Sequence, residues 1–245
     1  MKDIKSGKNL LIAFMAIIVI IVVIIVAPSV YKSYKEVFYP SYDRDGDGIP
    51  DNIDKFPDDP TEWKDSDNDG IGDNADPDDD NDGILDTNDY LPYVDAGIKV
   101  TVDRIRIKDF LVDRKTTGKI FLKIYIDNEE FVLPAEGFKE VNIDEDVYLN
   151  WSVTKNIPDD VGYHTIKLEL YYKDLLNTNK IIDINGKDAD KKDGRTLAIN
   201  YYIGNRIGSS ISSIEDGSDD GNYSPIPIFD EKDALIRYTI TTVAV

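Results

Sequence analysis

The chain has 245 residues, of which 41% are hydrophobic, and it carries a net charge of −20 with no cysteine and a single histidine. This composition excludes disulfides, zinc–thiolate sites, thiol nucleophiles and multi-histidine metal sites. It also argues against a nucleic-acid partner, because phosphate binding needs clustered Lys and Arg. The charge is concentrated in residues 43–95, where 20 acidic residues stand against three basic ones, a net charge of −17.

The N-terminal part has the pattern of a membrane anchor. Residues 10–27 are 18 uninterrupted apolar residues, which as a helix would span roughly 27 Å, close to the thickness of a bilayer core. The short segment 1–9 before it carries three lysines, so the positive-inside tendency predicts a cytoplasmic N-terminus. Residues 28–42 then form a juxtamembrane linker rich in aromatic residues. We therefore expect a single-pass protein of the cell membrane with its C-terminal part outside the cell.

Two alternatives to an uncleaved anchor remain. A cleavable signal peptide would use the small-x-small pattern at Ala27–Ser29, although a typical signal core has only about 7 to 15 apolar residues. A type IV pilin-like leader usually has a Glu near the start of the apolar helix, and none occurs here.

Residues 43–89 contain three copies of one acidic pattern, "DRDGDGIPDNID", "DSDNDGIGDNAD" and "DDDNDGILDTND". In each 12-residue copy Asp occupies positions 1, 3, 5, 9 and 12, Gly occupies position 6 and Ile position 7. The aspartates are Asp43, Asp45, Asp47, Asp51 and Asp54, then Asp65, Asp67, Asp69, Asp73 and Asp76, then Asp78, Asp80, Asp82, Asp86 and Asp89. The glycines are Gly48, Gly70 and Gly83, and the isoleucines are Ile49, Ile71 and Ile84.

This spacing predicts Ca²⁺ binding. Calcium takes six to eight oxygen ligands, and a 12-residue loop supplies them from positions 1, 3, 5, 7, 9 and 12, with the seventh residue contributing its backbone carbonyl. Gly at position 6 permits the sharp turn. An acidic disordered linker is the alternative that composition alone would favour. Such a linker does not need Gly and Ile in phase with Asp, and so the three copies favour metal loops.

The flanking residues distinguish between kinds of calcium loop. An EF-hand would end its loop with Glu between two helices, whereas position 12 here is Asp and prolines follow each loop. A dockerin would likewise need helices after its loops. Residues 43–92, including the spacer "FPDDPTEW", instead resemble the cysteine-free prokaryotic form of the thrombospondin type 3 repeat. The resemblance implies a chain wrapped around a row of calcium ions with little hydrophobic core. Asp58, Asp59 and Asp79 are further candidates for coordination between neighbouring ions.

Residues 97–245 have the pattern of an antiparallel β-sandwich. Runs with period-2 alternation and β-branched or aromatic residues occur at 98–107, 119–127, 164–172, 195–203 and 234–243, and turn-like stretches such as "DNEE" and "IPDDVG" separate them. Seven or eight strands without a convincing amphipathic helix are expected. The fold class is therefore mainly β, with an N-terminal transmembrane helix, a calcium-wrapped repeat stalk and a C-terminal sandwich.

The order "KIFLKIYID", "VYLNWSV", "IPDD", "IKLELYYKD" and "IIDING" in this part is similar to a C2-like domain. The resemblance implies calcium ligands in loops at one end of the sandwich, and residue-by-residue matching points to Asp174 and Asp183. Tyr172 stands where the pattern often has Asp. The segment 209–225 would add Asp216, Asp219 and Asp220 if it is a ligand loop, and is otherwise a mobile loop.

No catalytic constellation is evident. His164 lies beside a strand and is interpreted as structural, Trp151 as core packing, and the serines at 209–213 lack a nucleophile elbow. We therefore expect a non-enzyme, a surface protein whose calcium-stiffened stalk presents the sandwich for adhesion, envelope organisation or binding of an extracellular protein or glycan. The alternatives are an accessory or catalytic module acting on extracellular polymers, and a C2-like domain that binds lipid or glycan with calcium.

Overall fold

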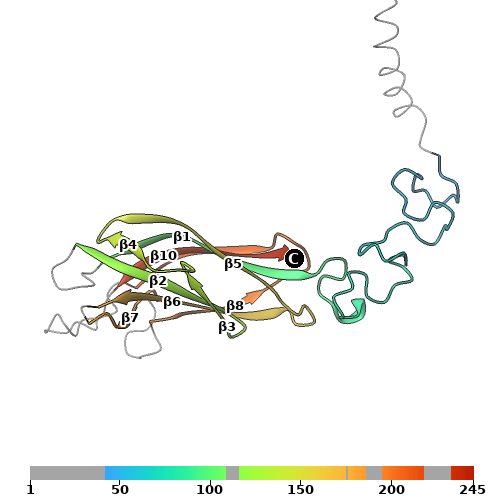
Figure 1. The fold of residues 1–245 in the computed structure, drawn as a ribbon. Coiled ribbons are helices and arrows are strands. Elements are labelled where there is room, and N and C mark those ends of the chain that lie inside the picture. Colours follow the sequence, from blue (N-terminus) through green and yellow to red (C-terminus); the bar gives the residue numbers. More distant parts are fainter. Residues whose placement is uncertain (1–41, 109–115, 175, 186–194, 218–232) are drawn as a thin grey trace, which may run out of the picture. The chain divides into compact units, whose positions relative to one another are not determined.

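The computed structural model describes residues 42–108, 116–174, 176–185, 195–217 and 233–245 (Figure 1). The chain divides into two compact units, residues 1–76 and residues 77–245, so the third predicted loop belongs to the same unit as the β-strands. Within the described part, no helix is long and apolar enough to cross a bilayer. The predicted segments 1–9 and 10–27, and all of the linker except Tyr42, lie outside the described residues.

In residues 42–76 the chain consists of turns and bends, without a helix or strand. None of its hydrophobic side chains is buried; the buried residues are Asp54, Glu62 and Gly72. Glu62 accepts a 3.0 Å hydrogen bond from the Asn74 N–H. A Cβ on Gly72 would lie 2.1 Å from Glu62 Oε2, so this glycine makes room for the carboxylate. Polar contacts therefore hold this unit, because an apolar core is missing from its described residues.

The second unit begins with one short 3₁₀ turn, η1 (Asp86–Asn88). Ten strands follow among the residues that the structure describes: β1 (Ala96–Ile107), β2 (Thr117–Ile126), β3 (Glu129–Leu133), β4 (Lys139–Asn142), β5 (Asp146–Asn156), β6 (Tyr163–Lys173), β7 (Asn179–Ile182), β8 (Leu197–Tyr202), β9 (Ser210–Asp216) and β10 (Ala234–Ala244). One sheet has the order β5-β1-β10-β9; the other has the order β3-β2-β6-β7, with β4 also paired to β2 and β8 to β6. All of these strand pairs are antiparallel.

The two sheets form a β-sandwich, as the sequence predicts, and the core lies between them (Figure 1). Alternate residues of β1 and β10 are buried because period-2 side chains point to one face of a strand. The register of β1 shifts between Val102 and Arg104, a β-bulge that restores the inward direction at Ile105. Trp151 packs partly buried against the core, which confirms its predicted packing role.

Each of the five predicted strand runs overlaps a strand, but the sandwich has more strands than the seven or eight expected. The stretch "DNEE", predicted as a turn, contains only a two-residue turn at Asp127 (φ 47°) and Asn128 (φ 70°), after which β3 begins. Such left-handed pairs join the strands of a tight hairpin.

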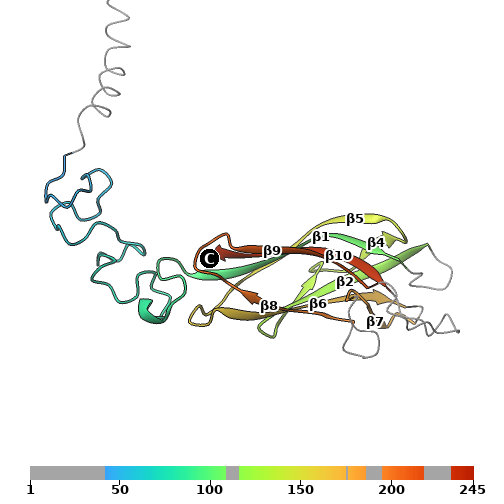
Figure 2. The same ribbon diagram turned by 180° about the vertical axis from the view of Figure 1, so that it is seen from behind.

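The expectation of a loop over 209–225 needs a correction at its start. Residues 210–216 are β9, which pairs with β10 at the edge of the sheet (Figure 2). The serine-rich sequence did not predict this strand, because an edge strand needs few apolar residues, and none of the residues of β9 is buried. Asp216 forms an ion pair with Lys108, and Asp219 and Asp220 lie outside the described residues.

Candidate metal centre

The three acidic loops share one backbone conformation. The glycines at position 6 have φ of 96°, 97° and 99°, in the left-handed region that favours glycine. Position 4 is also left-handed, at Gly46 (φ 82°), Asn68 (φ 65°) and Asn81 (φ 57°). Asn tolerates this region better than other non-glycine residues. The Gly or Asn at position 4 is thus a second turn signal, which the sequence analysis did not use.

Positions 1, 3 and 5 of each loop bring three carboxylates together. One oxygen from each member lies within 4.8 Å of the others in Asp43–Asp45–Asp47, in Asp65–Asp67–Asp69 and in Asp78–Asp80–Asp82. Oxygens bound to one calcium ion at 2.3–2.6 Å are at most about 5 Å apart, so each triad has a suitable size.

Backbone hydrogen bonds hold these carboxylates in place. In the third loop the Asp82 N–H donates to Asp80 Oδ1 at 3.1 Å, and the Ile84 N–H donates to Asp82 Oδ1 at 2.7 Å. The other two loops repeat both bonds. In them the N–H groups of Ile49 and Ile71, the predicted seventh residues, donate to Asp47 and Asp69. The second oxygens of Asp45 and Asp80 are buried without a hydrogen-bond donor, as expected of atoms that need a cation.

The aspartates at position 9 close the loops. Asp51, Asp73 and Asp86 accept the N–H of the residue at position 2, at 2.9, 2.8 and 3.0 Å respectively. Their own N–H groups donate to the carbonyls of Tyr42, Lys64 and Pro77. Partial burial alone would raise the pKa of Asp73, but hydrogen bonds from Lys64 and Ser66 lower it overall. The structure therefore gives these three residues a loop-closing role, beside the ligand role predicted for them.

The aspartates at position 12 differ in their surroundings. Asp54 is 8% exposed; its Oδ1 accepts the Phe56 N–H at 2.8 Å, while its Oδ2 is buried without a donor. Asp76 is half-buried, and its N–H donates to the Gly72 carbonyl. Asp89 has an oxygen within 4.8 Å of oxygens of Asp82 and Asp159. Position 12 of the third loop thus meets a residue of the sandwich.

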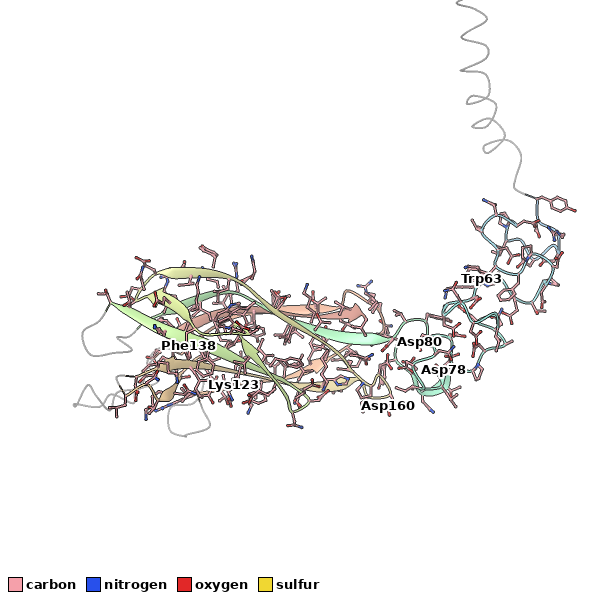
Figure 3. The ribbon with its side chains drawn as sticks, in the orientation of Figure 1. Trp63, Asp78, Asp80, Lys123, Phe138 and Asp160 are labelled. Carbon is pink, nitrogen blue, oxygen red and sulfur yellow. The ribbon has the colours of Figure 1, made fainter. Side chains whose placement is uncertain are left out.

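Asp159 lies in the connection between β5 and β6, within the predicted turn "IPDDVG". It is fully buried, and neither of its carboxylate oxygens has a hydrogen-bond donor. No sequence pattern distinguishes Asp159 from an ordinary turn residue, because one Asp in a turn is usually solvated. Only the three-dimensional structure brings it beside the third loop, and Figure 3 shows its neighbour Asp160 at the same end of the sandwich as Asp78 and Asp80.

The carboxylates of Asp80 and Asp159, in the second unit, lie in surroundings that favour a bound cation. Burial raises the pKa of Asp80 to about 6, and neighbouring carboxylates add to the rise. Burial also raises the pKa of Asp159 to about 8, with further increases from Asp89 and Asp82. Buried carboxylates without a cationic partner favour the protonated form. A bound divalent cation would reverse this preference.

The other predicted ligands have different environments. The Asp174 carboxylate accepts hydrogen bonds from the N–H groups of Leu176 and Thr178 and from the Thr178 hydroxyl. Asp183 is buried, and its Oδ1 accepts the Asn185 N–H at 2.7 Å. Among the described residues, neither belongs to a group of three or more acidic side chains close enough to share a metal ion.

The three further candidates for coordination between neighbouring ions also have defined contacts. Asp58 forms a 2.7 Å ion pair with Arg44, and Asp59 accepts hydrogen bonds from Thr61. Asp79 is 4% exposed, and its N–H donates to Asp86.

No known protein family matches the chain, and neither does any curated protein. Solved structures with a similar fold include a C2 domain of plant extended synaptotagmin 1, at 8% identity and a TM-score of 0.38, covering 62% of this chain and 97% of that one. Human GIVD cytosolic phospholipase A2 is similar at 11% identity and a TM-score of 0.38, covering 62% of this chain and 17% of that protein. Similarity this low says nothing of function.

Proposed function

We propose that the chain is a calcium-binding protein in which the three aspartate loops fold around Ca²⁺ and lead into the β-sandwich. The observation that carries this proposal is the repeated triad at positions 1, 3 and 5, in which three carboxylates converge within 4.8 Å. Several of their oxygens are buried without a donor. Three loops with the same left-handed turns and the same hydrogen bonds support one common ligand.

The donor atoms favour calcium over other metals. The clusters contain only carboxylate oxygens, which suit hard cations, whereas zinc and copper prefer histidine or cysteine. Magnesium usually keeps several waters and uses one or two carboxylates. A site with three convergent carboxylates and a flexible geometry fits the larger ion better.

Calcium binding would also fold the acidic segment. Residues 43–95 carry a net charge of −17, and the described part of the first unit buries no hydrophobic side chain. Without metal the carboxylates repel one another, and there is little apolar burial to oppose this repulsion. In such a case the free energy of metal binding becomes free energy of folding.

The sequence predicts the cellular location of this module. An anchor at residues 10–27 would place the loops outside the cell, where calcium modules with dissociation constants of about 10⁻⁴ to 10⁻³ M operate. The thrombospondin type 3 resemblance is consistent with a stalk that presents the sandwich to an extracellular protein or glycan. The alternative is calcium-dependent lipid or glycan binding by a C2-like domain through Asp174 and Asp183. These two residues give it less support, because among the described residues neither belongs to a group of acidic side chains close enough to share an ion.

Limited trypsin digestion of the full chain in detergent tests the proposal. The acidic segment contains three trypsin sites, at Arg44, Lys55 and Lys64. We expect chelation to increase cleavage at Lys55 and Lys64 at least about tenfold, because cleavage follows the population of the open form. Magnesium at the same concentration should protect much less than calcium. A reference substrate in the same tube corrects for effects of the chelator on trypsin.

Two variants show whether the loops are responsible. Asp67→Asn removes a ligand of the second triad and should abolish the calcium-dependent protection at Lys64. Asp160→Asn is the matched control, since Asp160 is exposed and belongs to none of the acidic clusters. Equal cleavage with and without calcium in the unmodified chain would overturn the proposed function.

A further inference from the structure

The Asp159 carboxylate occupies a position that a structural role does not explain. Its residue is fully buried, and neither oxygen receives a hydrogen bond. The carboxylates of Asp82 and Asp89 each have an oxygen within 4.8 Å of one of its oxygens, and no ion pair to Lys or Arg is found for these three among the described residues. An isolated buried carboxylate is strongly unfavourable unless a cation or a proton compensates it.

The backbone around this carboxylate is firmly held. The Ile157 N–H donates to the Ala96 carbonyl at 3.0 Å, which fixes the start of the β5–β6 loop against β1. His164 Nε2 lies 2.9 Å from the Val161 carbonyl and fixes its end. Between them, the Asp159 carbonyl accepts the Tyr90 N–H at 3.1 Å. The position of the carboxylate is thus determined by the fold and is not the chance orientation of a surface side chain.

The third loop is held against the same end of the sandwich. Leu91 is 4% exposed and belongs to the hydrophobic core, although it lies before the first strand. Its N–H donates to Asp89 Oδ1 at 2.7 Å, while Asp89 Oδ2 is buried without a donor. The Tyr90 ring packs edge-on against Tyr202, with centroids 6.0 Å apart. One oxygen of Asp89 therefore accepts a backbone N–H, and an oxygen of the same carboxylate lies within 4.8 Å of an oxygen of Asp159.

We propose that Asp82, Asp89 and Asp159 form a second calcium site in this unit, a clasp in which one ion joins the third loop to the β5–β6 loop of the sandwich. Asp82 belongs to this cluster and also to the triad with Asp78 and Asp80, so two neighbouring ions would share a ligand. Asp159 precedes β6 and Asp174 follows it, so the clasp lies at the opposite end of this strand from Asp174, one of the two residues predicted by the C2-like resemblance. This inference rests on the proposed calcium binding.

The clasp gives calcium a role beyond ordering the loops. With the ion bound, the last repeat and the sandwich move as one body because their carboxylates share a cation. Without it, the buried acidic side chains oppose the contact, which the Leu91 packing, the Tyr90 hydrogen bond and the Tyr90–Tyr202 ring contact then hold. Calcium therefore controls how firmly the third loop is attached to the sandwich.

Calorimetric titration of the full chain in detergent with CaCl₂ tests the clasp, using Asp159→Asn and the neighbouring Asp160→Asn. Asp160 is exposed and lies in none of the acidic clusters. We expect Asp160→Asn to bind like the unmodified chain. Asp159→Asn should lose about one equivalent of calcium, or bind one equivalent at least about tenfold more weakly, because affinity follows the number of charged ligands. Equal titrations for the two variants would overturn the clasp while leaving the proposed function intact.

Thermal unfolding separates a ligand role from a packing role. In calcium, Asp159→Asn should unfold at a lower temperature than Asp160→Asn. In chelator it should unfold at the same or a higher temperature, because the amide removes a buried acidic group from beside Asp82 and Asp89. A residue that only packs would lower the transition in both conditions, and that result would contradict the clasp. An unmodified chain that binds no calcium would contradict the proposed function itself.

Discussion

At the scale of single residues, the calcium loops depend on backbone conformations that few residues tolerate. Gly48, Gly70 and Gly83 have φ near +97°, and open space surrounds the position of a Cβ on each. A side chain there would therefore clash with nothing outside its own backbone, and its effect would come from the left-handed conformation alone. For most residues this conformation is unfavourable by about 1–2 kcal/mol.

A pair of substitutions in the third loop tests this argument. Gly83→Ala should weaken calcium binding by about 5- to 30-fold. The reason is that Ala must adopt the left-handed conformation, unfavourable by about 1–2 kcal/mol, when the loop closes around the ion. Asn81→Gly, at the left-handed position 4, should change the affinity little, because the first loop has Gly46 at the equivalent position. Calcium titration of both variants measures the difference. A Gly83→Ala loop with unchanged affinity would show that the turn does not limit binding.

His164 is also explained at this scale. It is 3% exposed, with Nδ1 2.6 Å from Asp127 Oδ2 and Nε2 2.9 Å from the Val161 carbonyl. Both ring nitrogens are engaged in holding neighbouring segments, and this supports the structural role expected for the residue.

At the scale of elements, one carboxylate joins the β2–β3 turn to the start of β6. Asp127 Oδ1 accepts the Thr165 N–H at 2.9 Å, while Oδ2 faces His164. Burial acts to raise the pKa of Asp127, but the bonds from His164 and the Thr165 N–H outweigh it and lower the pKa overall. A lowered pKa in the folded state means that the ionised form stabilises the fold at neutral pH and loses this effect as the pH falls.

Asp127→Asn should therefore reduce the free energy of unfolding by about 1.5–3 kcal/mol at pH 7, the range for hydrogen bonds to charged groups. The difference from the unmodified chain should shrink below about pH 4, where the carboxyl of the unfolded chain is protonated, and vanish as the pH falls through the folded-state pKa. Asn suits the left-handed backbone at φ 47°. Urea unfolding at several pH values measures the effect.

Asp144→Asn is the control for this measurement. Asp144 is also left-handed, at φ 60°, but it is exposed. Its substitution should stay within about 0.5 kcal/mol at every pH. A loss that is constant with pH at Asp127 would show that packing, and not the charge, is what matters there.

At the scale of the whole molecule, the charge is separated from the apolar core. Most of the net charge lies in residues 43–95, whereas the first buried hydrophobic side chain of the described residues is Leu91. The sandwich can therefore fold on apolar burial, while the acidic segment depends on counter-charge. The two parts should respond differently to metal and salt.

Small-angle scattering of the chelated chain should show this difference. Raising the ionic strength from 0.01 to 0.15 M shortens the screening length from about 30 to 8 Å, so the radius of gyration should fall as the repulsion within the acidic segment weakens. With saturating calcium the same salt step should have little effect, since bound ions already neutralise the loops. A chelated chain that does not respond to salt would contradict this account of the segment.

Three features of the sequence are local patterns: the aspartate spacing, the turn glycines and the alternating strands. Because short-range geometry determines them, they are enough to predict the loop positions and the β-sandwich. Local sequence by itself thus determined the triads at positions 1, 3 and 5. The tertiary structure decided the loop-closing role of Asp51, Asp73 and Asp86, the edge strand β9, and the meeting of Asp159 with Asp82 and Asp89. Asp159 is 70 residues from Asp89 in the chain, and the packing of Leu91 into the core and the hydrogen bond from the Tyr90 N–H to the Asp159 carbonyl bring them together.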